Sequence, residues 1–367
     1  MSLQVLVVPE QLRRAVPGGI GTYAAGLLGG LRDLDGQRPL PAIGVYASRR
    51  PGGAGAGPDP LESFGFPVTT SRLPGLALTR AWDRGLVHAP ARGGVVHAVS
   101  LAAPPVRAAH LVGTVHDLLW RSTPDAFPPR GRHWHEAALR RLLRRAAGFV
   151  VPSAVVAQEL VAAGAPPDGV HIVEPGCDHL PAPDHRGAER VLATLGVGGP
   201  FLLSVGTIEP RKNLQRVVAA YRAALPQLPE RWPLVVVGPV GWAAGGGFAA
   251  TEGVVAVGRV DPGVLAALYA SARVLAYVPL AEGYGLPPVE AMRAGAPVVS
   301  SRALPSVQGA ALEVDPRDVA GIAEALVVGA VDGPERRRLV EVGTARVKGL
   351  TWKVAAEGHL AVWEALG

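Results

Sequence analysis

The chain has 367 residues with a formal net charge of +6, and 49% of its residues are hydrophobic while 18% are charged. This composition excludes global disorder, and the length exceeds what one hydrophobic core usually organises, so we expect two globular domains. Aromatic residues make up only 5%, so a nucleic-acid-binding surface, which interleaves basic and aromatic side chains, is not expected.

Features of membrane and secreted proteins are weak. The longest uncharged run, 233–251, has membrane length but contains five glycines and two prolines, which disfavour a spanning helix. The apolar stretch 3–8 lacks preceding basic residues and predicts a first strand rather than a signal peptide. The single cysteine, Cys177, cannot form an internal disulfide, which fits a reducing compartment. We therefore expect a cytoplasmic protein.

Short valine- and leucine-rich runs recur along the chain, each followed by a glycine-bearing turn and a stretch of helical period. This alternation predicts βα units that form parallel sheets. The predicted strands are 5–8, 42–46, 94–99, 111–115, 148–151 and 171–173 in the first half, and 201–205, 234–237, 254–257, 274–277 and 297–300 in the second. The polar, proline-bearing stretch 181–187 predicts a linker, so we expect two doubly wound α/β domains at 1–185 and 186–350.

A glycine-rich segment, Pro17-Gly-Gly-Ile-Gly-Thr-Tyr23, follows the first predicted strand and begins a helix. Gly19 and Gly21 could let the backbone lie close to a phosphate or a sugar. The same glycines fit a dinucleotide-binding fingerprint, but the next predicted strand, 42–46, carries no acidic residue, which disfavours a nicotinamide cofactor. A simple tight turn is the remaining alternative.

Two further segments of the first half carry polar side chains of interest. His116 and Asp117 follow the predicted strand 111–115, where such a pair serves either a binding site or a helix cap beside a packed imidazole. The segment Arg140-Arg-Leu-Leu-Arg-Arg145 predicts a helix with an arginine face, which suits either solvent or an anionic lipid surface.

The strongest local signal is Phe201-Leu-Leu-Ser-Val-Gly-Thr-Ile-Glu-Pro-Arg-Lys-Asn-Leu214, a strand that runs into a glycine turn. Pro210 suits a helix start, which would place Arg211 and Lys212 in the opening turn. Cations are unfavourable beside the exposed N–H groups of a helix start unless an anion lies between them. The segment therefore predicts a diphosphate site, with a solvated basic turn as the alternative.

A second signal lies in Pro279-Leu-Ala-Glu-Gly-Tyr-Gly-Leu-Pro-Pro-Val-Glu290. Glu282 follows a strand, Gly283 and Gly285 let the backbone approach a ligand, and the prolines begin a helix with Glu290 in its first turn. Loops after the strands of open parallel sheets bind ligands. Glu290 could accept hydrogen bonds from ribose hydroxyls or simply complement the helix dipole, and Glu282 could bind sugar hydroxyls or stabilise positive charge on an anomeric carbon.

Together, these two segments resemble the retaining glycosyltransferase family 4, and in particular its bacterial mannosyltransferase-like branch. The resemblance covers nearly the whole chain. It implies the GT-B fold, in which two Rossmann-like doubly wound parallel-sheet domains face a cleft. The domain at 1–185 would take the acceptor, the domain at 186–350 would bind the nucleotide-sugar donor, and a helix at 351–367 would cross back to the first domain.

Motifs and resemblance together give each candidate residue an expected role. The expected catalytic residues are His116, Arg211, Lys212 and Glu282, and Asp117 is expected on the acceptor side. The expected donor-binding residues are Gly19, Gly21, Gly206, Arg259, Gly283, Tyr284, Gly285, Leu286 and Glu290. Ser306 and the Gly309-Ala310 pair stand where the branch commonly has acidic residues, so a carboxylate contact from that loop is in doubt.

These features predict a retaining hexosyltransferase that uses a nucleoside-diphosphate sugar, first GDP-mannose and next a UDP-hexose. The acceptor would be a saccharide or a lipid-linked molecule, with a peripheral contact to an anionic membrane as a further hypothesis. A non-catalytic nucleotide-sugar-binding scaffold and a GT-B nucleotide-sugar epimerase are the alternatives. We expect no required metal or other cofactor, because Arg211 and Lys212 would neutralise the diphosphate.

Overall fold

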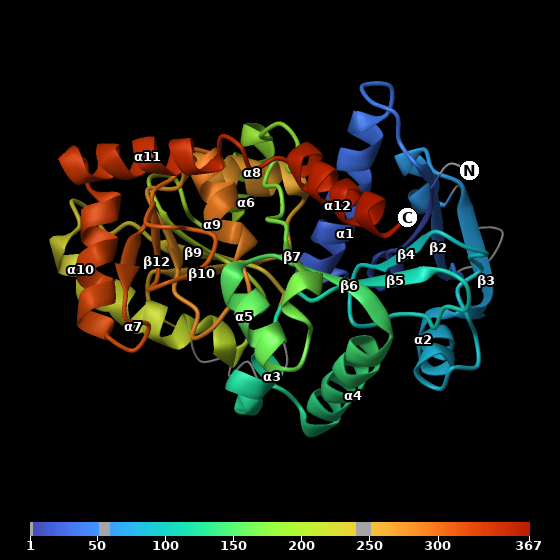
Figure 1. Ribbon diagram of the computed structural model, residues 1–367. Helices are drawn as coiled ribbons and strands as arrows, with labels where there is room; N and C mark the ends of the chain where they lie inside the picture. Colours follow the sequence, from blue (N-terminus) through green and yellow to red (C-terminus); the bar gives the residue numbers. More distant parts are fainter. Residues whose placement is uncertain (1–2, 51–58, 240–250) are drawn as a thin grey trace. The chain divides into compact units, whose positions relative to one another are not determined.

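The computed structural model describes residues 3–50, 59–239 and 251–367, and these form two compact units (Figure 1). The first unit comprises Met1–His179 with Leu350–Gly367, and the second comprises Leu180–Gly349. Each has its own parallel sheet and core, which confirms the predicted fold class of two Rossmann-like sheets. The second unit begins at Leu180, a few residues before the predicted boundary at 185, and Asp184 N donates to Gly263 O at 2.9 Å within that unit.

Membrane-spanning helices are absent from the described residues, where no helix is both long and apolar enough to cross a bilayer. Residues 240–250 of the uncharged run 233–251 lie outside the described part of the chain.

In the first unit, the described strands form a seven-stranded parallel sheet in the order β3-β2-β1-β4-β5-β6-β7. Their bounds are β1 Gln4–Val8, β2 Ala42–Arg49, β3 Val68–Pro74, β4 Val95–Ala98, β5 His110–Thr114, β6 Ala146–Val151 and β7 Val170–Ile172. Strand β3 was not predicted, because its Val-Thr-Thr-Ser-Arg-Leu-Pro sequence lacks an apolar run, as suits a partly exposed edge strand.

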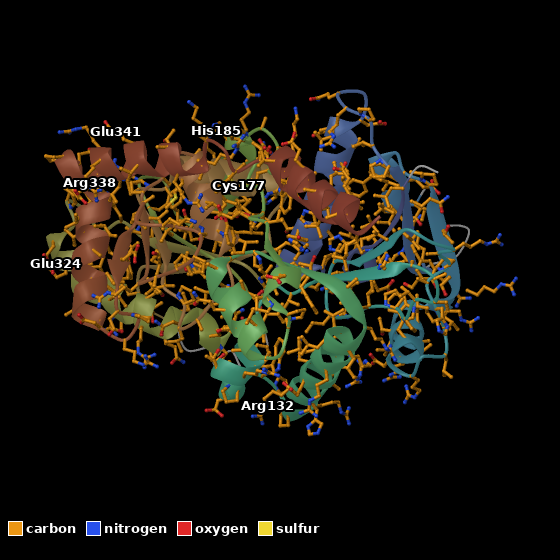
Figure 2. All side chains as sticks on the ribbon, in the orientation of Figure 1. Arg132, Cys177, His185, Glu324, Arg338 and Glu341 are labelled. Atoms are coloured by element: carbon orange, nitrogen blue, oxygen red, sulfur yellow. The ribbon has the colours of Figure 1, made fainter. Side chains whose placement is uncertain are left out.

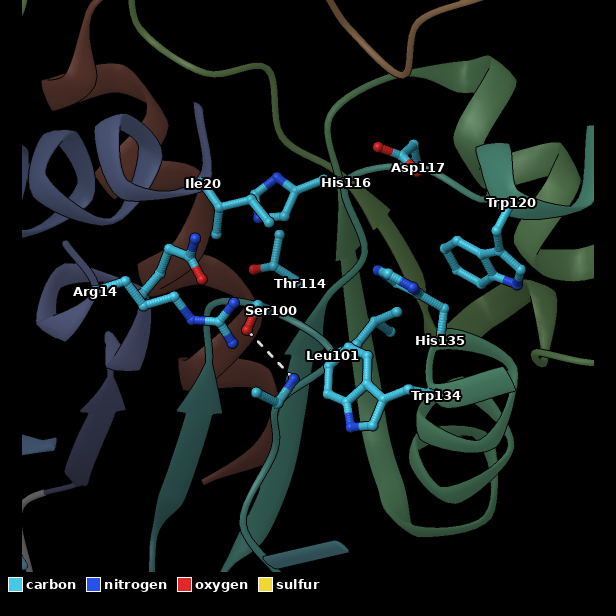
Figure 3. A pocket seen from close by; sticks show the side chains of 12 residues that line it. Arg14, Ile20, Ser100, Leu101, Thr114, His116, Asp117, Trp120, Trp134 and His135 are labelled. Carbon is cyan, nitrogen blue, oxygen red and sulfur yellow. Dashed lines mark hydrogen bonds between the residues drawn. The ribbon is translucent and has the colours of Figure 1, made fainter. Parts of the chain in front are cut away.

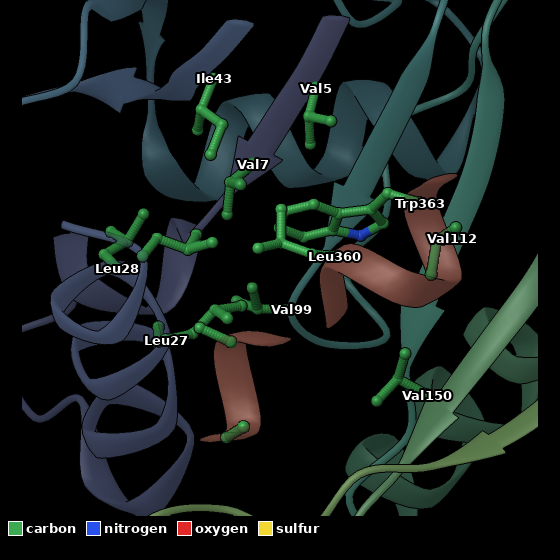
Figure 4. Packing of buried hydrophobic residues seen from close by; sticks show 14 of the residues in the cluster. Val5, Val7, Leu27, Leu28, Ile43, Val99, Val112, Val150, Leu360 and Trp363 are labelled. Atoms are coloured by element: carbon green, nitrogen blue, oxygen red, sulfur yellow. The ribbon is translucent and has the colours of Figure 1, made fainter. Parts of the chain in front are cut away.

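The helices of the first unit are α1 Gly18–Leu34, α2 Gly75–Asp83, α3 Leu119–Ser122, α4 Pro129–Arg145, α5 Ala154–Ala162 and α12 Trp352–Leu366. The last helix, α12, packs along α1 over a core that also includes Val7, Val112 and Val150 from the sheet (Figure 4). Gly26 and Gly30 make this approach feasible. A Cβ atom on Gly26 would lie 2.1 Å from Trp352 Cε2, and one on Gly30 would lie 2.1 Å from Trp352 O.

The segment that leads into α12 is hydrogen-bonded to Cys177 and Asp178, near the end of the stretch Met1–His179. Cys177 is buried, its thiol lies 3.3 Å from Leu350 O, and its N–H donates to the same carbonyl at 3.0 Å (Figure 2). Trp352 N donates to Asp178 Oδ1 at 2.8 Å. These bonds fix the beginning of the last helix on the first unit.

In the second unit, the described strands form a six-stranded parallel sheet in the order β10-β9-β8-β11-β12-β13. Their bounds are β8 Leu202–Val205, β9 Leu234–Val237, β10 Val254–Gly258, β11 Leu275–Tyr277, β12 Val298–Ser301 and β13 Leu312–Val314. The helices are α6 His185–Thr194, α7 Leu214–Ala224, α8 Pro262–Ser271, α9 Leu286–Arg293, α10 Val319–Ala330 and α11 Pro334–Val347. The three-residue edge strand β13 was also missed from the sequence, because it is too short to show a pattern.

Each sheet has a point where the strand order reverses. In the first sheet the reversal lies between β1 and β4, and in the second it lies between β8 and β11. Loops leaving adjacent strands at such a point turn to opposite sides and leave a crevice at the carboxyl edge of the sheet. The candidate residues Gly19, Gly206, Lys212 and Glu282 lie after these strands, whereas His116 and Asp117 follow the next strand, β5.

Candidate functional site

The two cations predicted for a helix start lie instead in a separate turn before the helix. Pro210–Lys212 form one 3₁₀ turn, Asn213 has a left-handed backbone with φ 59°, and α7 begins at Leu214. The buried Asn213 amide holds this geometry by donating to Val278 O at 3.0 Å and to Pro316 O at 2.7 Å. Pro210 does begin a helical turn that holds Arg211 and Lys212, but this turn is 3₁₀, and the left-handed Asn213 separates it from α7.

Arg211, Lys212 and Glu282 form one ion-paired cluster beside the reversal point of the second sheet. Glu282 Oε2 lies 3.0 Å from Arg211 Nη1 and 2.5 Å from Lys212 Nζ. Arg211 Nη2 also lies 2.6 Å from Glu209 Oε1, and Arg211 Nη1 donates to Ala281 O at 3.2 Å. All four charged side chains are largely buried, so their attraction is screened less than at an open surface.

Tyr277, the last residue of β11, completes this cluster. Its hydroxyl donates to Glu282 Oε2 at 2.8 Å and accepts from Lys212 Nζ at 2.6 Å. Burial and the neighbouring Glu282 raise the pKa of Tyr277 well above its usual value, so the phenol keeps its proton. The sequence analysis missed Tyr277, although its place at the end of a buried strand beside the motif was a usable signal.

Electrostatics keep Glu282 ionised. Burial alone would raise the pKa of this carboxyl, but Lys212 and Arg211 outweigh burial and lower the pKa to about 2. Burial lowers the pKa of Lys212, and the neighbouring Glu282 carboxylate raises it but does not cancel the effect of burial. In this structure the Glu282 carboxylate therefore supplies the negative charge expected beside Arg211 and Lys212. A bound diphosphate would have to replace this carboxylate.

The loop after Glu282 leads into α9. Gly285 has φ 95° and precedes the helix, Leu286 is its first residue, and Gly283 and Tyr284 are buried. The loop containing Ser306 packs against this segment, because Ser306 N donates to Tyr284 O at 3.2 Å.

Glu290 lies in the second turn of α9 rather than the predicted first, because the helix begins at Leu286. Glu290 is 7% exposed, and its carboxylate accepts a hydrogen bond from Tyr269 Oη at 2.7 Å. Burial and Glu290 raise the pKa of Tyr269 well above its usual value, so Tyr269 remains a donor. Tyr269 therefore already orients one oxygen of the carboxylate that was expected to meet ribose hydroxyls.

Gly206 and Arg259 lie on different strands of the second sheet. Gly206 follows β8 with φ 145°, a conformation that favours glycine, and lines a small pocket with Thr207, Lys212 and Tyr277. Arg259 is exposed after β10, the edge strand that β9 separates from β8. The structure thus brings Gly206 to the cluster and leaves Arg259 at the edge of the sheet.

The first unit has its own pocket at its reversal point (Figure 3). It is lined by Gln11, Arg14 and Ile20 after β1, by Ser100, Leu101 and Ala102 after β4, and by Thr114, His116, Asp117, Trp120, Trp134 and His135 from β5 to α4. Of the predicted residues, His116 and Asp117 are therefore brought into one pocket. The aromatic side chains of α3 and α4 were missed, because helical spacing alone did not distinguish them from core residues.

His116 is oriented by the backbone rather than by Asp117. Its Nε2 lies 2.8 Å from Val99 O, and its ring packs edge-on against Tyr23 with centroids 4.7 Å apart. Burial lowers the pKa of His116, while Val99 and Asp117 oppose the shift. Asp117 Oδ1 instead accepts from Leu119 N at 3.1 Å at the start of α3. Asp117 therefore bonds to the backbone at the start of α3, although Leu118 is the cap residue of that helix.

The glycines after β1 differ in their surroundings. Gly19 is exposed, and a Cβ atom there would meet nothing within 4 Å. A Cβ atom on Gly21 would lie 2.2 Å from Pro17 Cβ. Close packing against Pro17 at the start of α1 therefore accounts for Gly21, whereas Gly19 leaves open space for a ligand.

Comparisons with known proteins agree on one family. Residues 17–179 match the family described as Glycosyltransferase Family 4, and residues 199–329 match Glycosyl transferases group 1. O-antigen chain mannosyltransferase B of Escherichia coli is 29% identical over 265 residues, which are 68% of this chain and 68% of that protein. D-inositol 3-phosphate glycosyltransferase of Nocardia farcinica is 28% identical over 286 residues, 71% of this chain and 62% of that protein.

The fold is shared with a solved structure. HepE of Anabaena, crystallised with UDP and glucose, superposes with a TM-score of 0.70 at 16% identity, over 99% of this chain and 100% of that chain. At this identity the likeness concerns the fold.

Proposed function

The chain belongs to glycosyltransferase family 4 and has the GT-B fold of a glycosyltransferase, and from this premise we propose that it transfers a hexose with retention. The donor in this proposal is a nucleoside-diphosphate hexose, and GDP-mannose is the first candidate because a mannosyltransferase is among the relatives. The acceptor is a hydroxyl of a saccharide or of a lipid-linked molecule.

The observation that carries the proposal is the Arg211–Lys212–Glu282 cluster at the reversal point of the second sheet. Arg211 offers a planar fork of donors and Lys212 a compact charge, a combination that suits two phosphate groups. Gly206 and the backbone around Gly283 can lie close to such a ligand. A diphosphate would take over the cations that Glu282 now holds, which frees its carboxylate to face the hexose.

The proposed step breaks the bond between the anomeric carbon and the donor phosphate oxygen. The acceptor oxygen forms the new bond on the same face, and its proton passes to the departing phosphate oxygen. Arg211 and Lys212 stabilise the negative charge that develops on the diphosphate. The ionised Glu282 stabilises the positive charge that develops on the anomeric carbon.

The test is calorimetric titration with GDP, UDP and ADP in the presence of chelator, followed by NMR of products formed from the matching sugar donors. Preferential binding of one nucleotide and a product of unchanged anomeric configuration would support the proposal. Binding without turnover would favour the scaffold alternative, and conversion of the donor without any acceptor would favour the epimerase. An inverted product would contradict retention.

A further inference from the structure

We propose that Trp134 and His135 form a carbohydrate subsite in the first-unit pocket, which holds a neutral sugar ring of the acceptor. The inference rests on the proposed glycosyl transfer and adds the chemical class of the group bound beside the reacting hydroxyl. Figure 3 shows both side chains extending from α4 toward the part of the pocket formed by Thr114 and His116.

The aromatic side of this pocket is held rigid by its own contacts. Trp134 Nε1 donates to Asp83 Oδ2 at 3.0 Å, which fixes the indole plane. The His135 ring is stacked on Trp120 with centroids 5.0 Å apart and meets Trp134 edge-on at 5.1 Å. Rigid, partly exposed rings offer apolar faces at low entropic cost, and the C–H faces of a pyranose pack well on such surfaces.

Hydrogen bonding fixes which nitrogen of each imidazole can meet a ligand. His135 Nδ1 lies 2.7 Å from Gly131 O, and because a carbonyl only accepts, Nδ1 carries the proton and Nε2 is left as an acceptor. His116 Nε2 lies 2.8 Å from Val99 O, so its Nδ1 is the acceptor by the same argument. Two imidazoles with free lone pairs therefore line this pocket.

This polarity selects the class of ligand. Sugar hydroxyls can donate hydrogen bonds to the acceptor nitrogens of both imidazoles. The oxygens of an ionised phosphate only accept hydrogen bonds, so they would be repelled by the lone pairs of these nitrogens. Arg14, which lines the pocket from the segment after β1, supplies donors for the remaining sugar oxygens, and Gln11 Nε2, which already donates to Pro17 O at 2.8 Å, has one further N–H. The combination of aromatic faces, two acceptors and separate donors suits a neutral hexose ring.

The first test is saturation-transfer NMR of the full chain with methyl α-D-mannopyranoside and methyl α-D-glucopyranoside as probes. We expect saturation transfer to at least one probe with the wild type, and a dissociation constant at least about fivefold weaker with Trp134→Ala and with His135→Ala. His133→Ala is the matched control, because His133 is exposed on the same helix and does not line this pocket. No saturation transfer to either probe, or variants that bind like the wild type, would overturn the subsite.

The second test separates this inference from the proposed function. With an active donor and acceptor, both alanine variants should raise KM for the acceptor and leave KM for the donor unchanged. If the wild type showed neither transfer nor donor hydrolysis, the proposed function would be contradicted. Binding of the two probes would still test the subsite independently. Trp134→Phe keeps an aromatic face, so it should recover part of the binding even where Trp134→Ala folds poorly.

Discussion

The phenolic oxygen of Tyr23 lies 2.6 Å from Nε2 of His359, so a buried hydrogen bond joins the first helix of the chain to the last. His359 Nδ1 lies 2.7 Å from Ala355 O, which assigns the proton to Nδ1 and makes Tyr23 the donor. The rings of Tyr23 and His116 also pack in a T-shaped arrangement, so α12 supports the wall of the first-unit pocket through Tyr23.

A second buried histidine, His97, links α12 to the sheet of the first unit. Trp363 Nε1 donates to His97 Nδ1 at 3.0 Å, and His97 Nε2 therefore donates to Thr114 Oγ1 at 2.8 Å. The His97 and His359 rings stack with centroids 5.2 Å apart. Both imidazoles must stay neutral in the folded protein, because charging either would bury an unpaired cation.

Acidification should therefore destabilise the fold through His359. Burial lowers its pKa to about 4, below the value of about 6.5 expected in the unfolded chain. Between these values only the unfolded chain takes up the proton, so the free energy of unfolding should fall by up to about 3 kcal/mol as the pH falls from 6.5 to 4. Burial shifts the pKa of the facing His97 and His116 in the same direction.

The measurement is denaturant unfolding of the wild type and His359→Gln at several pH values in this window. The variant should be less stable at pH 7.5 and should lose stability less steeply on acidification, because it lacks the titrating ring. The same pH slope in both proteins would contradict a role for His359.

Two glycines of α1 should respond in opposite ways to alanine. A Cβ atom on Gly30 would clash with backbone atoms of Trp352, whereas one on Gly29 would meet nothing within 4 Å. Gly29→Ala should stabilise the protein by about 0.5–1 kcal/mol, because alanine favours helix. Gly30→Ala should destabilise it by about 1–3 kcal/mol, because α12 must shift. Chemical denaturation decides the outcome, and stabilisation by both changes would show that α12 does not pack this closely.

Removing either cation of the second-unit cluster should slow transfer. Arg211→Ala and Lys212→Ala should each raise the activation barrier by roughly 2–4 kcal/mol, because the departing diphosphate loses a charge partner. The measurement is kcat with saturating donor, and Arg222→Ala, an exposed arginine of α7, is the matched control. Full turnover by either cluster variant would exclude the proposed role of that side chain.

Glu282→Gln should affect binding and turnover in opposite directions. The ionised carboxylate competes with a diphosphate for Arg211 and Lys212, so the neutral amide should tighten nucleoside-diphosphate binding by about threefold to tenfold. Transfer should slow, because the hexose loses its facing carboxylate. Calorimetry and kinetics test both effects, with Glu252→Gln as a control at an exposed ion pair. Weaker nucleotide binding by Glu282→Gln would refute the competition.

The hypothesis of membrane contact through α4 predicts a purely electrostatic association. Leu139 and Leu142 are buried and Leu143 is partly buried against the core, so the leucines of the arginine-rich segment are turned inward. Arg144 and Arg145 are exposed. Flotation with anionic vesicles should weaken with added salt and with the double change Arg144→Gln and Arg145→Gln, each arginine contributing about 1 kcal/mol. Flotation that does not depend on anionic lipid would remove this hypothesis.

The sequence by itself determined the two parallel sheets, because each βα unit repeats a local pattern of an apolar run, a glycine turn and a helix. It also placed Lys212 and Glu282 after strands whose carboxyl ends meet at one sheet edge. Two of the edge strands escaped this reasoning, since β3 is partly polar and β13 is short, whereas the edge strands β7 and β10 carry enough apolar residues to be predicted.

Only the tertiary structure decided how the polar groups pair. Asn213 donates hydrogen bonds to distant carbonyls and so separates the cations from α7, and Tyr277 joins Lys212 to Glu282. Tyr23 and His359 lie 336 positions apart in the chain. Such contacts leave no periodic trace in the sequence, because a buried polar group must find a partner wherever the packing of whole helices and sheets brings one within reach.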